Sequence, residues 1–87
     1  MRTVILYHPN NEFVGKVEDF KRDFEARHPD KKVELICLET VQGADMAKIY
    51  DVVRYPAILV IGPEGSLQKF WQDQPFPLMD EVLAYYQ

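Results

Sequence analysis

Residues 53–61, Val-Arg-Tyr-Pro-Ala-Ile-Leu-Val-Ile, constrain the fold of this 87-residue chain more than any other segment. Pro56 stands directly before residues 57–61, an aliphatic run that has the length and composition of a buried strand. Because proline cannot donate a hydrogen bond to a neighbouring strand, it belongs at the start of a strand and not inside it. An X-Pro bond is also the one peptide bond that becomes cis at modest cost. The sequence therefore predicts a proline turn at Tyr55-Pro56 that leads into a strand.

Three further strands are predicted from short apolar runs. Residues 3–7 read as a first strand that is buried on both faces, residues 33–39 as a second, and residues 67–71 as a fourth. The turn at residues 62–66, Gly-Pro-Glu-Gly-Ser, is too short to cross a sheet, so the fourth strand should run antiparallel to the third.

Apolar stripes predict three helices. The first stripe has spacings of four, three and four residues, which is one face of a helix: Phe13, Val17, Phe20 and Phe24. This helix should begin at an Asn10 or Asn11 N-cap and end near Arg27, before Pro29. A second helix is expected at residues 44–53, after a loop at residues 40–43. The last helix carries the stripe Leu78, Val82, Leu83 and Tyr86.

The predicted order is βαβαββα, and its first strand–helix–strand unit implies parallel pairing with a right-handed crossover. With Tyr55-Pro56 before the third strand and a glycine turn into the fourth, this order resembles the thioredoxin-like fold over nearly the whole chain. Residues 47–61 and 65–71 look most like the second half of thioredoxin and protein disulfide isomerase domains. The resemblance implies a cis Tyr55-Pro56 bond and a single α/β domain over residues 1–87. Its four-stranded mixed sheet would have the order 2-1-3-4, with the second helix on one face and the other two helices opposite.

Redox-active members of that family carry a CxxC motif at the start of the first helix, where the helix dipole lowers the thiol pKa. The matching segment here is His-Pro-Asn-Asn-Glu-Phe-Val at residues 8–14, so that Asn11 and Val14 stand at the cysteine positions. The sole cysteine, Cys37, falls in the middle of the predicted second strand, where we expect it to be buried and inert. We therefore expect no dithiol–disulfide exchange, and a redox-inactive domain.

A remnant of the family's cleft is the first candidate site. The resemblance implies that His8 lies near the proline turn, and the cleft would then be formed by His8, Asn10, Asn11, Tyr55 and Pro56. No nucleophile or carboxylate pair accompanies His8, so we assign no catalytic residue. We expect no metal, because two histidines this far apart do not have ligand spacing, and no cofactor. A non-redox enzyme, or a protein that binds glutathione or another thiol in this cleft, is the alternative function.

A protein interface is the second candidate site. Trp71 ends the predicted edge strand, Phe76 lies between two prolines in the following loop, and interfaces are enriched in such aromatic residues. An open edge strand can also be extended by a partner strand. Our leading hypothesis is a protein-interaction or scaffold module that binds another protein or itself; a purely structural domain is the other possibility.

Charge and hydropathy limit the partners. The net charge is −4, from 14 acidic and 10 basic residues, which disfavours nucleic acid because phosphates are repelled. No apolar run approaches the roughly 20 residues that cross a bilayer, so we expect no membrane insertion. The sequence begins with a strand-like run and not with a hydrophobic signal segment, which predicts a cytoplasmic protein.

Overall fold

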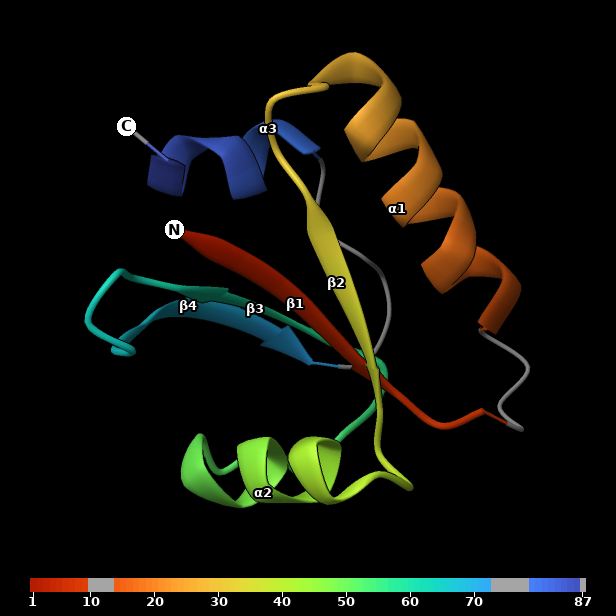
Figure 1. Cartoon of the computed structure of the whole chain (residues 1–87), viewed down its shortest axis with the longest axis vertical. Helices are drawn as coiled ribbons and strands as arrows, with labels where there is room; N and C mark the ends of the chain where they lie inside the picture. Colours follow the sequence, from red (N-terminus) through yellow and green to blue (C-terminus); the bar gives the residue numbers. More distant parts are fainter. Residues whose placement is uncertain (10–13, 73–78, 87) are drawn as a thin grey trace.

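The computed structural model describes residues 1–9, 14–72 and 79–86 (Figure 1). Its elements follow the predicted βαβαββα order: β1 (Arg2–Tyr7), α1 (Val14–Arg27), β2 (Val33–Cys37), α2 (Val41–Ile49), β3 (Ala57–Ile61), β4 (Leu67–Gln72) and α3 (Met79–Leu83), followed by the 3-10 turn η1 (Ala84–Tyr86). The fold is thus a mixed α/β arrangement with three helices among the described residues.

The four strands form one mixed sheet in the order β2-β1-β3-β4, which confirms the predicted order. β2 runs parallel to β1, with Thr3 opposite Val33. β3 runs antiparallel to β1, with Ile5 opposite Ile58, and β4 runs antiparallel to β3. All five residues of β3 are buried, because this strand lies between two others and is covered on both faces.

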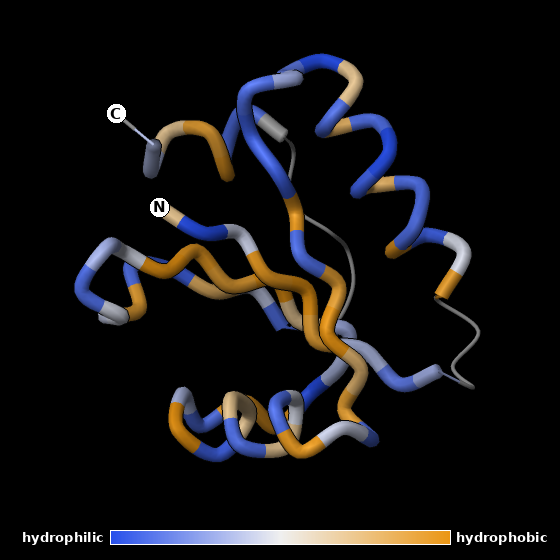
Figure 2. The backbone as a smooth tube through the Cα atoms, viewed as in Figure 1, coloured by the Kyte–Doolittle hydropathy of each residue, from blue (hydrophilic) through white to orange (hydrophobic). Residues whose placement is uncertain are grey.

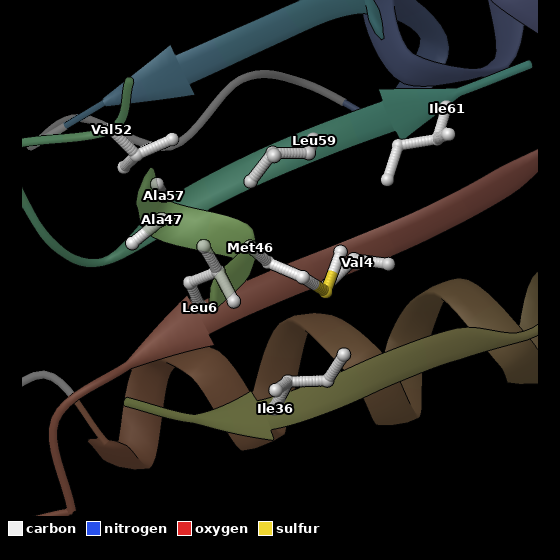
Figure 3. Packing of buried hydrophobic residues seen from close by; sticks show 9 residues of the cluster. All are labelled: Val4, Leu6, Ile36, Met46, Ala47, Val52, Ala57, Leu59 and Ile61. Carbon is white, nitrogen blue, oxygen red and sulfur yellow. The ribbon is translucent and has the colours of Figure 1, made fainter. Parts of the chain in front are cut away.

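Helices cover both faces of the sheet, because alternate residues of a strand point to opposite sides. On one face α2 packs against the sheet, and the buried residues there form what we call the α2 cluster. Within it Met46 of α2 extends toward Val4 of β1 (Figure 3). That cluster comprises Val4, Leu6, Ile36, Met46, Ala47, Val52, Ala57, Leu59 and Ile61. On the other face α1 and α3 pack on the α1–α3 cluster, formed by Ile5, Val17, Phe20, Phe24, Val33, Ile58, Val60 and Val82. Figure 2 shows the resulting pattern, with continuous apolar stretches in β1 and β3 and alternating character along α1.

The apolar stripe predicted for α1 is confirmed where it is described. Val17, Phe20 and Phe24 are the buried residues of this helix, and Phe13 lies outside the described residues, as do the proposed caps Asn10 and Asn11. The helix ends at Arg27, as predicted before Pro29. In the last helix Val82 is fully buried and Leu83 and Tyr86 pack against the same cluster, while Leu78 is outside the described residues.

The predicted end of β2 and the predicted start of α2 are wrong, while β2 begins at Val33 as predicted. β2 ends at Cys37 and not at residue 39, because Thr40 turns back and donates its backbone N–H to the Cys37 carbonyl at 3.1 Å. Thr40 then caps α2, since its Oγ1 accepts the N–H of Gly43 at 3.0 Å. The helix consequently begins at Val41, within the segment that the sequence had suggested to be a loop.

The predicted end of α2 is wrong as well, since the helix stops at Ile49 and not at residue 53. Asp51 has a left-handed backbone (φ 57°). The Asp51 and Val52 N–H groups donate back to the carbonyls of Lys48 and Ala47, which is a Schellman-type termination. The chain therefore reverses here, and Ile49, the last residue of the helix, is 71% exposed.

Candidate functional site

The Tyr55–Pro56 corner lies between α2 and β3. Pro56 is buried immediately before the first residue of β3, where it costs the sheet no hydrogen bond, and the Tyr55–Pro56 peptide bond is cis. Tyr55 is half-buried against the α2 cluster, and its hydroxyl donates to the carbonyl of Val52 at 2.9 Å. The tyrosine is thus held by its own loop, with its ring at the surface of the corner.

Gln72, the last residue of β4, attaches this loop to the sheet. Its Oε1 accepts the backbone N–H groups of Val53 at 3.0 Å and of Arg54 at 3.1 Å. Gln72 stands opposite Ala57, so the contact joins the end of β4 to the start of β3. No sequence pattern points to Gln72, which was predicted to lie in the loop after the fourth strand, because only the strand register brings its side chain to these amides.

His8 meets this corner from the end of β1. Its exposed ring lies edge-on to Tyr55, with ring centroids 5.0 Å apart and an angle of 82° between the planes. His8, Tyr55 and Pro56 therefore come together, while Asn10 and Asn11 lie outside the described residues. Among the described residues His8 has no hydrogen-bonded carboxylate or nucleophile, and its contact at this corner is the aromatic one with Tyr55.

Cys37 is half-buried at the end of β2, and the expectation of a buried residue in the middle of a strand is wrong. Its Sγ accepts the backbone N–H of Glu39 at 3.4 Å, and its Cα pairs with that of Tyr7 across the sheet. The difference arises because the turn at Thr40 ends the strand two residues earlier than the apolar run suggests.

Trp71, the first of the proposed interface residues, lies on the sheet face that carries α1 and α3. It is half-buried against the α1–α3 cluster, and its ring meets that of Tyr85 edge-on, with centroids 6.0 Å apart. The Nζ of Lys69 lies 5.9 Å from the Trp71 ring centroid. Trp71 is therefore part of the packing between β4 and the C-terminal turn, and Phe76 lies outside the described residues.

Metal-binding clusters and membrane-spanning helices are both absent from the described part of the chain. No group of three or more His, Cys, Asp or Glu side chains there is arranged to hold a metal ion. None of the described helices is long and apolar enough to span a bilayer.

The chain matches no protein-family model and none of the curated proteins. Its function is accordingly inferred from the topology of the sheet, the Tyr55–Pro56 corner and the side chains of the exposed edge.

Proposed function

We propose that this chain is a redox-inactive thioredoxin-like domain that serves as a protein-interaction or scaffold module. The sheet order β2-β1-β3-β4, with β2 parallel to β1 and the other neighbours antiparallel, supports this family. So do the distribution of α2 on one face and of α1 and α3 on the other, and the position of Pro56 directly before β3.

The number of cysteines supports the redox-inactive part of the proposal. Dithiol–disulfide exchange needs an attacking thiolate and a second sulfur to resolve the mixed disulfide, and this chain has one cysteine in all. That cysteine, Cys37, ends β2, whereas the family's catalytic pair stands at the start of the first helix. No rearrangement of side chains supplies the missing sulfur.

Exposed apolar side chains support the interaction part. Val41, Ile49 and Val53, which belong to α2 or follow it closely, are 79%, 71% and 70% exposed. Burying aliphatic groups of this size against a partner lowers the free energy, because it removes apolar surface from water. The alternative of a non-redox enzyme or thiol-binding protein has weaker support, since the Tyr55 hydroxyl already donates to a backbone carbonyl and no described carboxylate hydrogen-bonds to His8.

Insulin reduction by dithiothreitol tests the redox part. The purified chain should leave the rate of insulin precipitation at the level of dithiothreitol alone, while a dithiol thioredoxin in the same buffer accelerates it. Turnover by the purified chain would contradict the proposal, and a Cys37→Ser variant would then show whether this single thiol is responsible.

Affinity capture from the native host tests the interaction part. The immobilised full chain should retain a protein that, once purified, also binds the chain in a direct titration. Sedimentation of the chain alone at increasing concentration separates this outcome from self-association. A chain that stays monomeric and retains no protein that binds it directly would contradict the interaction module and favour a purely structural role.

A further inference from the structure

β4 is an open edge of the sheet. It pairs with β3 on one side, and no other described strand pairs with it on the second side (Figure 1). Alternate residues of an antiparallel edge strand direct their N–H and C=O groups outward, where a further strand can bind them. Gln68 and Lys69 in this strand are also exposed, so their side chains are accessible from solvent.

The opposite edge, β2, is closed at both ends. The outward N–H of Val33 donates to Oε2 of Glu25 at 2.9 Å, and Lys21 holds the same carboxylate at 2.7 Å. At the other end the Cys37 carbonyl accepts the N–H of Thr40 at 3.1 Å and its hydroxyl at 2.6 Å. A strand added at β2 would have to displace these contacts, which makes β4 the edge that can take a partner.

The side chains of β4 define what such a partner must present. Leu67 and Phe70 pack toward the α2 cluster, and Lys69 and Trp71 lie on the other face. Leu67 and Phe70 are three residues apart and would lie on opposite faces of a regular strand. They share a face because the register shifts by one residue opposite Val60 and Ile61. Four residues of β4 also line a surface hollow of about 280 Å³: Leu67, Gln68, Lys69 and Phe70.

We propose that the outer edge of β4 binds an extended acidic–apolar segment of another protein as a fifth strand. Lys69 is the one charged residue of β4, so the residue across from it should be an Asp or Glu. In a fifth strand that runs parallel to β4, the next residue along the partner would face Phe70, and the one after it Trp71, so both should be apolar. This inference rests on the proposed interaction function and adds its surface and the chemistry of the partner.

Lys69 also disfavours a second copy of this chain as the occupant. A two-fold axis that keeps both sheets continuous pairs two antiparallel β4 strands, and the registers that pair the most residues of Leu67–Gln72 are centred on Lys69 or on Phe70. The first places the two Lys69 ammonium groups opposite each other and the second places them on a diagonal, where like charges repel. Each copy also carries a net charge of −4. The lysine that opposes self-pairing is the residue that attracts an acidic strand.

Fluorescence anisotropy with defined peptides tests the proposal on the full chain. The probe is a fluorescein-labelled peptide with the centre Thr-Asp-Val-Phe-Thr between Gly-Ser ends, and the matched control has Lys in place of Asp. We expect the Asp peptide to bind about tenfold more tightly than the Lys peptide, with the difference reduced at high salt. Equal binding of the two peptides would overturn the proposed role of Lys69.

Backbone methylation of the peptide tests the strand addition itself. In Thr-Asp-Val-Phe-Thr, one variant is N-methylated on Asp and Phe, and a second on Val and the last Thr. Each pair of methyl groups blocks one edge of the extended backbone. One of the two should lose binding and the other keep it, because only one edge can face β4. If both variants bind like the parent peptide, or if neither binds, strand addition at β4 is refuted.

Charge variants of the protein locate the contact. Lys69→Glu should weaken binding of the Asp peptide about tenfold, whereas Lys69→Arg should retain it. Lys32→Glu is the matched control, since Lys32 is also exposed but precedes β2 at the opposite edge. Circular dichroism should show the same fold for all three variants. Equal losses in Lys69→Glu and Lys32→Glu would show a general charge effect and contradict a site at β4.

Binding of a captured host protein to wild type and to Lys69→Glu tests the β4 site independently of the interaction function. Weaker binding of that protein to Lys69→Glu, together with competition by the Asp peptide, supports both. If the protein binds wild type and Lys69→Glu equally, the interaction function stands and the β4 site is wrong. If the Asp peptide binds at β4 but no host protein is retained, the edge is confirmed as a binding surface and the interaction function fails.

Discussion

Replacing Gly43 with alanine tests how α2 is seated on the sheet. Gly43 is a buried residue in the first turn of this helix. A Cβ added to it would overlap the carbonyl oxygen of Cys37 and would lie 2.8 Å from the carbonyl carbon and 3.0 Å from the Cα of Leu38. All three atoms belong to the backbone, so no side-chain rotation relieves the contact.

The helix can relieve the clash only by moving away from β2. That movement strains the cap, in which Thr40 Oγ1 accepts from Gly43 and donates to the Cys37 carbonyl. Overpacking costs about 1–3 kcal/mol and a lost cap about 1 kcal/mol, which gives about 2–4 kcal/mol for Gly43→Ala. A domain of this size has a total stability of roughly 4–13 kcal/mol, so the variant should unfold about 10 °C or more below wild type.

Urea denaturation, followed by circular dichroism and by the fluorescence of the single tryptophan, measures this difference. Gly15→Ala is the matched control, because Gly15 lies in α1 and a Cβ there meets no atom within 4 Å. The control should leave stability unchanged or raise it by up to about 1 kcal/mol, since alanine favours a helix. A Gly43→Ala variant within about 0.5 kcal/mol of wild type would refute the close contact between α2 and the end of β2.

Two smaller effects are also expected. Hydrogen bonds from Lys21 and then from the Val33 N–H hold the pKa of Glu25 below its ordinary 4.5. A lowered folded-state pKa stabilises the fold above that ordinary value and ceases to do so as the pH falls through the folded-state value. Glu25→Gln should therefore cost less than about 1 kcal/mol at neutral pH and progressively less as the pH is lowered below the ordinary pKa, and a loss that does not shrink in acid would contradict this explanation. Tyr86→Phe removes the hydroxyl bonded to the hydroxyl of Thr3, which is fully buried, and should cost about 1–2 kcal/mol. Adding Thr3→Val should recover most of that loss in urea denaturation, and an unchanged double variant would refute the pairing.

The elements with strong local patterns were predictable. Residues 57–61 form a strand in both the prediction and the structure, because an uninterrupted aliphatic run after a proline has few alternatives. Val17, Phe20 and Phe24 are buried in α1, since their spacing alone places them on one face of a helix. His8 and Tyr55 also meet, as the predicted strand order requires.

The α2 region shows where sequence patterns stop being sufficient. Gly43 is a poor helix former, which made residues 40–43 look like a loop. In the structure a glycine is required there because the helix touches the backbone of Cys37. Ile49 and Val53 have the character of core residues, yet the left-handed Asp51 ends the helix and leaves both exposed. The predicted roles of Asn10, Asn11 and Phe76 lie outside the described residues and stay predictions.

The sequence by itself determined the order of strands and helices and the lack of a cysteine pair in this chain. Periodicity is a property of neighbouring residues, and a count of one cysteine holds in any fold. Only the tertiary structure decided that Gln72 holds the Tyr55–Pro56 loop and that Glu25 and Thr40 bind the outward backbone groups at the two ends of β2. These features depend on which backbone groups meet across the sheet, and that is set by strand register and helix packing between distant segments.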